Sequence, residues 1–213
     1  MSIPSAIAQA LDRIERARQA SGCSDRVALE LAVKTRSPEE CREAAQALSD
    51  LGQPILLGHN RVQEAKATVD AIREVPGAQI HLIGPLQSNK INQALSCVNA
   101  IESIDSVALV QKIDSRVTRE LPVFIEVTAS TYLRLAGLMT VGLNSPAEAD
   151  VCRGYALLRE LRDTAAQQLA IPATNLELSM GMSHDLEWAI AEGATIVRVG
   201  TAVFGPRRLV ARG

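Results

Sequence analysis

Two stretches near the C-terminus end in small and hydroxyl-bearing residues, in a pattern that could bind phosphate. Residues 178–185 read LSMGMSHD and include Ser183, and residues 197–201 read VRVGT and end in Gly200 and Thr201. Each looks like a buried strand that runs into the start of a helix. Backbone N–H groups at a helix start point at an anion, and the helix dipole favours its charge. The pattern therefore predicts a cup for a phosphorylated ligand.

Lys34 adds a reactive group to the same part of the predicted fold. It follows the apolar run of residues 27–33, so it would stand at the carboxyl end of a strand, where barrel active sites lie. For an isolated lysine, the simpler interpretation is an exposed strand end. Beside a phosphate cup and partly desolvated, a lysine can instead form a Schiff base with an aldehyde. A phosphorylated aldehyde would explain both features.

Short apolar runs alternate with helical stretches along the chain. This alternation is typical of a mostly parallel sheet with helices outside it, and eight such units favour a closed barrel. No Gly-x-Gly-x-x-Gly follows the first run, which argues against a dinucleotide-binding sheet. We therefore predict an α/β fold, a single-domain TIM-type (β/α)8 barrel over residues 1–213. The predicted strands are residues 27–33, 55–57, 79–83, 100–104, 123–127, 135–141, 175–179 and 196–199.

Local signals mark several helices. Residues 1–21 place apolar side chains at helical spacing between charged ones, which predicts an extra N-terminal helix. Ser37, Pro38 and Glu40 form the pattern of a capping box, and residues 145–148 repeat it. The connection over residues 128–134 is too short for a parallel crossover with its helix. We expect that the fifth crossover helix is missing there, or that a disordered segment is absent from the sequence.

Composition excludes several classes of function. The chain has 213 residues, 47% of them hydrophobic, and a net charge of -2 at pH 7. With 2% aromatic residues and no basic stripe, nucleic acid is not an expected partner. No apolar run approaches the roughly 20 residues that span a bilayer, so we expect no membrane partner and a cytoplasmic location. The cysteines are too widely spaced to predict a zinc site or a disulfide framework, and no metal site is expected.

Six ordered segments carry a family resemblance. Together they resemble the pyridoxal phosphate homeostasis protein family, whose fold is similar to the N-terminal barrel of alanine racemase. The resemblance implies that pyridoxal 5'-phosphate (PLP) is the ligand. The segments are AVKT at 32–35, GHNRVQE at 58–64, HLIGPLQSNK at 81–90, GLMT at 137–140, LSMGMSHD at 178–185 and RVGTAVFG at 198–205.

The resemblance assigns roles to residues of the cup. It implies that Lys34 carries the cofactor as a Schiff base. It also implies that Ser183, Gly200 and Thr201 bind the phosphate, with the backbone around Met182 contributing. Without the resemblance, Ser183 would be read as a helix N-cap, and the two roles are compatible.

Further residues are matched to the ring of the cofactor. Arg198 matches the arginine that faces the pyridine nitrogen, although a strand-end charge paired with a carboxylate is the simpler interpretation of an arginine there. Asn60 lies in a motif that closes over the ring side. Glu126 and Thr128 depart from the Gln and Asn common in the family, so their ring contacts are not carried over. A guanidinium stays protonated and leaves the pyridine nitrogen unprotonated, so the ring is a weaker electron sink.

Three functions are compatible with these residues. The first is a carrier that buffers PLP or delivers it to apo-enzymes, as a monomer or weak dimer. The second is a weak PLP-dependent racemase of the alanine racemase class. Two-base racemisation needs a second acid or base, which alanine racemase takes from a tyrosine in a second domain. We expect no such domain after this barrel, and neither Tyr132 nor Tyr155 matches that position, so robust catalysis is not expected. The third is a cup for another phosphate.

The three histidines lie in matched motifs. His59 replaces the Glu that many relatives carry, His81 is expected to face inward as a hydrogen-bonded core residue, and His184 is expected to be exposed at the cup. None is given a catalytic role. Residues 87–90 are interpreted as a structural loop.

Overall fold

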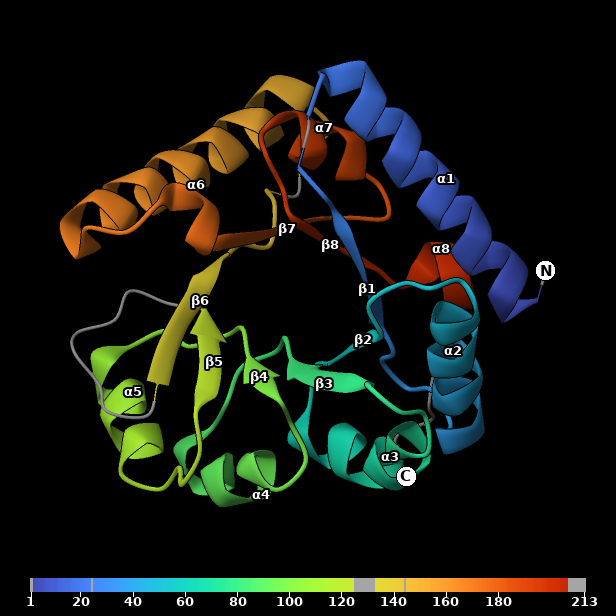
Figure 1. Cartoon of the computed structure of the whole chain (residues 1–213), viewed down its shortest axis with the longest axis vertical. Coiled ribbons are helices and arrows are strands. Elements are labelled where there is room, and N and C mark those ends of the chain that lie inside the picture. Colours follow the sequence, from blue (N-terminus) through green and yellow to red (C-terminus); the bar gives the residue numbers. More distant parts are fainter. Residues whose placement is uncertain (1, 24, 125–132, 144, 207–213) are drawn as a thin grey trace.

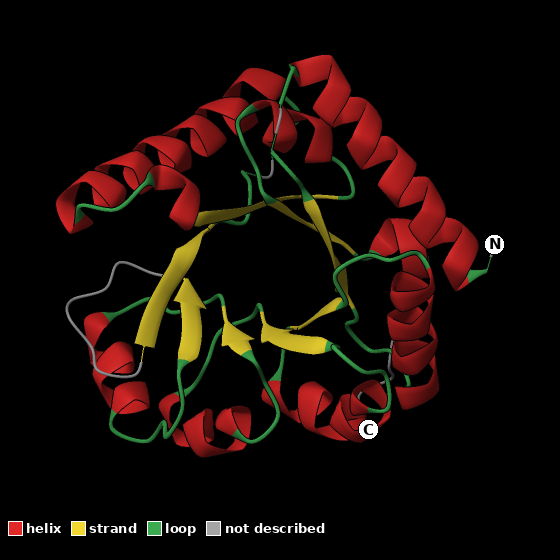
Figure 2. Cartoon of the chain, viewed as in Figure 1, coloured by secondary structure: helices red, strands yellow, loops and turns green. Residues whose placement is uncertain are grey.

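Parallel strands form a closed barrel with helices around it. The computed structural model describes residues 2–23, 25–124, 133–143 and 145–206. Within these residues, eight strands pair in chain order from β1 to β8, and β1 closes the barrel by pairing with β8. Figure 1 shows the helices outside the strands, and Figure 2 shows the ring of strands in yellow inside the red helices. The predicted TIM-type barrel is confirmed.

All eight predicted strands are present, and all except β8 differ from the prediction at one end or both. Four differ at their ends by no more than about two residues, within the usual uncertainty of boundaries. The predicted fourth strand shrinks to two residues, the fifth begins two residues earlier, and the seventh runs three residues further. The strands are β1 (Ala28–Ala32), β2 (Leu56–His59), β3 (Gln79–Leu82), β4 (Ala100–Ile101), β5 (Leu121–Phe124), β6 (Leu133–Met139), β7 (Glu177–Met182) and β8 (Ile196–Val199).

The helices cover the outer face of the barrel. Ser37 caps α2 reciprocally with Glu40, as predicted. The helices are α1 (Ile3–Ser21), α2 (Pro38–Asp50), α3 (Val62–Arg73), α4 (Ile91–Leu95), α5 (Val107–Asp114), α6 (Glu148–Leu169), α7 (Leu186–Ala191) and α8 (Thr201–Phe204), with short 3-10 turns η1 (Ser88–Lys90) and η2 (Ala173–Asn175).

The second predicted capping box is wrong. Helix α6 begins at Glu148, and its N-cap Ala147 makes no side-chain cap. The Ser145 hydroxyl accepts from the backbone N–H of Ala147 at 3.2 Å and donates to Asp150 at 3.2 Å. Ser145 therefore organises the turn that leads into the helix, and the helix starts two residues later than the pattern indicates.

The predicted extra N-terminal helix is confirmed as α1. It buries an apolar stripe that includes Ile7 and Ile14, and it packs against α2, α7 and α8. In Figure 1 it runs along the outside of the barrel beside α8 and α2. Fully burying such a side chain stabilises the fold by about 1.5 to 3 kcal/mol.

The connection between β5 and β6 is as short as the sequence indicates. The two strands are parallel neighbours, and only residues 125–132 join them. The predicted crossover irregularity falls mostly on these residues, which lie outside the described part of the chain, as do Glu126, Thr128 and Tyr132. No helix among the described residues is long and apolar enough to cross a membrane.

Candidate functional site

A pocket opens at the carboxyl ends of β1, β7 and β8. It has a volume of about 230 Å³. Six of the seven predicted site residues line it: Lys34, Met182, Ser183, Arg198, Gly200 and Thr201. They come from three separate segments of the sequence, which the barrel brings to one rim. Asn60 follows the end of β2 and is not part of the lining, and its Oδ1 is buried with no described hydrogen-bond partner.

The turn after β7 is held by buried polar groups. The Asp185 carboxylate accepts from the backbone N–H of Met182 at 2.6 Å and from the Tyr155 hydroxyl at 2.8 Å. Burial and the hydrogen bond to Asp185 raise the pKa of Tyr155, so this tyrosine stays protonated. The N-cap of α7 is Asp185 and not Ser183. The Ser183 hydroxyl accepts instead from the backbone N–H of Ala202, at 3.4 Å.

The N-terminal helix reaches the same turn from outside. Arg13 of α1 donates from Nη1 to the backbone oxygen of Ser183 at 2.5 Å. It also donates from Nη2 to Glu187 of α7 at 2.5 Å, and its Nε contacts the same carboxylate. We call these contacts of Arg13 with Ser183 and Glu187 the α1 clamp.

The two residues that follow Lys34, Thr35 and Arg36, also lie at this site, although the sequence pattern did not indicate them. Thr35 has φ 59°, in the left-handed region that a β-branched residue rarely adopts. Such strain is held in place by its surroundings and is found near functional sites. Arg36 lines the pocket and lies 5.3 Å from the ring centroid of Phe204. Its Nε is buried without a described acceptor. A basic residue two positions after Lys34 was the available signal in the sequence.

Arg198 is buried where β8 reaches the pocket. It is 5% exposed. Its Nη1 donates to the backbone oxygen of Ser179 at 2.9 Å and to the Ser179 hydroxyl at 2.5 Å, and its Nη2 donates to the backbone oxygen of Thr140 at 2.7 Å. These three hydrogen bonds use only the two terminal nitrogens of the guanidinium. Arg198 is thus fixed in one orientation beside the ligand pocket.

Comparison with known proteins identifies the family. The pyridoxal phosphate homeostasis protein of Aquifex aeolicus is 33% identical to this chain over 231 aligned positions, which cover 95% of the chain and 97% of the relative. The chain belongs to the pyridoxal phosphate homeostasis protein family. The family's protein from Pseudomonas aeruginosa is 34% identical, with 94% of both chains covered. No protein-family model matches the chain.

Solved structures share the barrel of this homeostasis-family protein. PipY of Synechococcus elongatus, in a structure with PLP bound, is 30% identical, with a TM-score of 0.78, and covers 96% of this chain and 100% of its own. Alanine racemase of Clostridium difficile has a TM-score of 0.66 at 12% identity. It matches 92% of this chain and 55% of its own length. The second likeness shows the fold alone.

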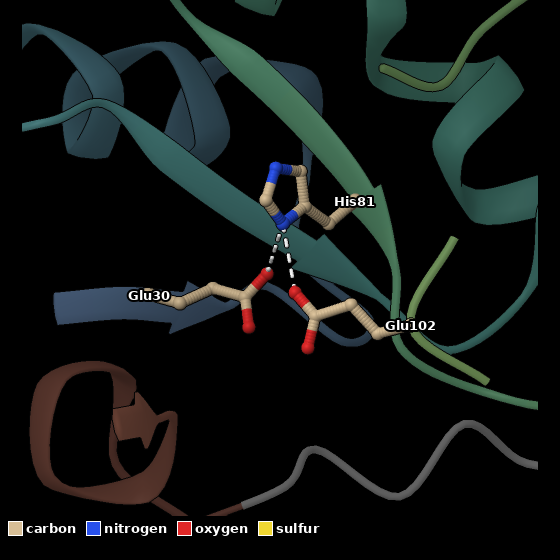
Figure 3. A group of neighbouring side chains, drawn as sticks. All are labelled: Glu30, His81 and Glu102. Atoms are coloured by element: carbon tan, nitrogen blue, oxygen red, sulfur yellow. Dashed lines mark hydrogen bonds and ion pairs between the residues drawn. The ribbon is translucent and has the colours of Figure 1, made fainter. Parts of the chain in front are cut away.

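His81, the first residue of the motif at 81–90, lies in a buried ionic cluster of this family member. His81 Nδ1 lies 2.8 Å from Glu102 Oε1 and 3.3 Å from Glu30 Oε1 (Figure 3). Strands β1 and β3 are not neighbours, so these side chains meet inside the barrel. We call Glu30, His81 and Glu102 the triad. The prediction that His81 is an inward-facing, hydrogen-bonded residue is confirmed. Gln87 and Lys90 form the turn at η1, where the Lys90 N–H donates to the Gln87 oxygen.

The triad is charged although it is buried. Burial alone would lower the pKa of His81, but its contacts with the charged groups of Glu102 and Glu30 outweigh burial and raise that pKa to about 10. Burial opposes ionisation of Glu102, yet the contacts with His81 and Arg198 hold its pKa below the ordinary value. Burial and the neighbouring Glu102 charge raise the pKa of Glu30. His81 is therefore an imidazolium at neutral pH, and Glu102 is its main counterion.

This charge state predicts a pH-dependent stability. The pKa of His81 rises from an ordinary 6.5 to about 10 on folding, so its contribution is complete below pH 6.5 and is lost as the pH rises toward 10. The free energy of unfolding of the wild type relative to His81→Gln should therefore fall over this window, by up to about 1.4 kcal/mol per pH unit. Urea unfolding at several pH values measures it. Parallel curves for the two proteins would contradict an imidazolium at His81.

The other two histidines differ from His81. Burial lowers the pKa of His59 to about 4, so this ring is neutral, and it lies 3.0 Å from the Thr68 hydroxyl. His59 is a core residue and is not part of the pocket lining. His184 is exposed, as predicted, and it lines the pocket.

Proposed function

We propose that this chain binds PLP in the pocket and acts in intracellular PLP homeostasis, as a carrier that buffers the cofactor or delivers it to apo-enzymes in the cytoplasm. The observation that carries the proposal is the convergence of Lys34, Ser183, Gly200, Thr201 and Arg198 on one pocket. PLP supplies an aldehyde that reacts with an amine, and a phosphate that anchors it. Membership of the family supports the same ligand.

The residues of the pocket fit the parts of this cofactor. Lys34 provides the amine for a Schiff base. Ser183, Thr201 and the backbone around Met182 and Gly200 provide hydroxyl and N–H groups for the phosphate. A Cβ at position 200 would lie 3.2 Å from the backbone oxygen of Ala32, so a side chain there would crowd β1 at the edge of the pocket. The glycine keeps the backbone open to an anion.

Two arginines complete the electrostatic fit. Arg36 has a buried Nε without a described partner at the pocket wall, and a ligand oxygen would satisfy it. Arg198 presents a fixed positive charge, which suits a ring nitrogen that stays unprotonated. Asn60 is assigned to the side of the ring by family resemblance, although it does not line the pocket.

Loading and transfer test the carrier function. Apo protein is incubated with PLP, freed of excess cofactor and examined by intact-mass measurement after borohydride reduction. A second portion of the loaded protein, which is not reduced, is mixed with an apo form of a PLP-dependent enzyme. We expect one covalent adduct, and recovery of enzyme activity faster than with the same concentration of free PLP in the presence of competing amines. Absence of an adduct would contradict PLP as the ligand and would favour another phosphate.

A weak racemase is the second candidate, and one observation favours it. The imidazole of His184 lines the same pocket as Lys34, so two groups that exchange protons face one ligand space. Incubation of the loaded protein with L- and D-alanine distinguishes the functions. The carrier proposal expects no sustained interconversion, and turnover of about 1 per second or more would support an enzyme. A His184→Asn variant shows whether any such turnover depends on that ring.

A further inference from the structure

The triad is connected to the ligand pocket through Ser179 and Arg198. The Ser179 hydroxyl donates to Glu102 Oε2 at 2.6 Å and accepts from Arg198 Nη1 at 2.5 Å. Arg198 Nη1 also lies 3.9 Å from Glu102 Oε2. All three side chains are at least nine-tenths buried. A carboxylate at the centre of the barrel therefore has a direct path to the guanidinium that lines the pocket.

We propose that Glu102 is a positioning residue for the ligand: acting through Ser179, it holds Arg198 in the orientation that faces the ring nitrogen of PLP, while His81 binds the other oxygen of the same carboxyl group. The inference rests on the proposed function, because it concerns the ligand that Arg198 would face. It adds to that function a charged layer one level below the pocket.

The arrangement of β1 places this layer below the pocket. Side chains alternate along a strand, so Glu30 and Ala32 of β1 share a direction. Ala32 and Lys34 line the pocket, and Glu30 lies one step deeper. Gly58 on β2 leaves space for it, since a Cβ at position 58 would lie 3.0 Å from Glu30 Oε1. The layer is thus built to accommodate these side chains, where barrels usually place branched apolar residues.

The two glutamates differ in one respect that the proposal uses. Both carboxylates contact His81 Nδ1 (Figure 3), and both residues are at most 1% exposed. Glu102 also receives the Ser179 hydroxyl, whereas neither oxygen of Glu30 has a hydrogen-bond partner among the described residues. The same substitution at the two positions therefore separates the path to Arg198 from the general effect of altering a buried carboxyl group.

A metal ion is the competing occupant of the triad. The ligand atoms of its three side chains lie within 4.8 Å of one another, which a divalent cation could bridge. Two positive groups, the imidazolium of His81 and the guanidinium of Arg198, already offset the two carboxylates. A divalent cation would have to displace the His81 proton and lie close to Arg198, so we argue for the proton-bridged state.

The decisive comparison is Glu102→Gln against Glu30→Gln. Each variant is titrated with PLP, and the dissociation constant and the pH dependence of the visible absorbance band are measured. We expect Glu102→Gln to weaken binding by about tenfold or more, because a hydrogen bond to a charged group is lost behind Arg198. We also expect it to move the pH midpoint of the band. In Glu30→Gln, the dissociation constant should stay within about twofold of wild type, and the pH midpoint of the band should not move.

Both variants keep Lys34, so the mass adduct reports the proposed function separately. A wild type without an adduct would mean that the proposed function fails, whereas adducts with unchanged affinity and pH midpoint in Glu102→Gln would overturn the positioning role alone. Equal effects of the two substitutions would also overturn it, because they would indicate a merely structural cluster.

Ser179→Ala keeps the proposal testable if Glu102→Gln does not fold. It removes the hydroxyl that bridges Glu102 and Arg198 and leaves both charges in place. We expect the same direction of change as for Glu102→Gln, with a smaller effect. Unchanged affinity and pH midpoint in Ser179→Ala would contradict the path. Elemental mass spectrometry of the purified protein tests for a metal ion in the triad. A stoichiometric metal, together with an absorbance spectrum that changes on chelation, would overturn the proton-bridged state in favour of a metal site.

Discussion

Replacing Lys34 by alanine should abolish the covalent PLP adduct. A Schiff base needs an amine at the ring aldehyde, and Lys34 is the amine that follows β1 at the pocket. The cup of Ser183, Gly200 and Thr201 is untouched, so weak non-covalent binding should remain. Intact-mass measurement after borohydride reduction gives the adduct, and the visible absorbance band should disappear with it.

The chain offers a matched set of controls for this prediction. It has four lysines in all, and the other three are Lys66, Lys90 and Lys112. None of these lines the pocket, and Lys66 and Lys112 are exposed on α3 and α5. Alanine substitutions at these positions should leave the adduct and the absorbance band unchanged. An adduct that persists in Lys34→Ala and disappears in one of the three would show that another lysine carries the cofactor.

Gly137→Ala should destabilise the protein by at least about 3 kcal/mol, the range of severe core changes. Gly137 lies on β6, paired with Glu177 of β7. An added Cβ would lie 2.1 Å from the backbone oxygen of Glu177 and 2.7 Å from its carbonyl carbon. Backbone atoms cannot relieve the clash by a change of rotamer, as a side chain can. Strands β6 and β7 must therefore separate, on the side of the barrel next to the short β5–β6 connection. Urea unfolding measures the loss.

Gly154→Ala is the matched control on the outer helix α6. There a Cβ would meet only Leu143 Cδ1, at 4.0 Å. The same substitution should stabilise the protein by about 0.5 to 1 kcal/mol, because alanine favours the helix more than glycine does. If the free energy of unfolding falls in Gly137→Ala and rises in Gly154→Ala, the effect at Gly137 is due to crowding between strands. Similar losses at both would contradict that explanation.

The sequence predicts the barrel and most of the pocket because both depend on local patterns. Alternating apolar runs locate the strands, and residues that follow a strand of a parallel barrel lie at one rim by topology alone. Lys34, Ser183 and Thr201 could be placed together for this reason, before any distance between them was known. The capping box at Ser37 is likewise a contact between residues three positions apart.

The buried cluster could not be predicted in the same way. Glu30 reads as an acidic interruption of an apolar strand, and Glu102 as a residue near a short one. The pairing of β1 with β8 and of β3 with β4 in the closed barrel brings their carboxylates to His81 and Arg198. The start of α6 was mispredicted for a related reason: Ser145 has the right type and spacing for a cap, but its hydroxyl already accepts from Ala147.

The α1 clamp joins the first helix to the ligand cup across most of the sequence. Arg13 and Ser183 are 170 positions apart, yet one hydrogen bond connects them. Docking of α1 and binding of a ligand in the cup share this contact, so the two equilibria are coupled reciprocally. If the docked helix strengthens ligand binding, the bound ligand must stabilise the docked helix by the same free energy. The backbone amides of α1 are then an external reporter on the interior of the barrel. Their exchange with solvent deuterium would slow as the pocket fills, although the helix never touches what fills it.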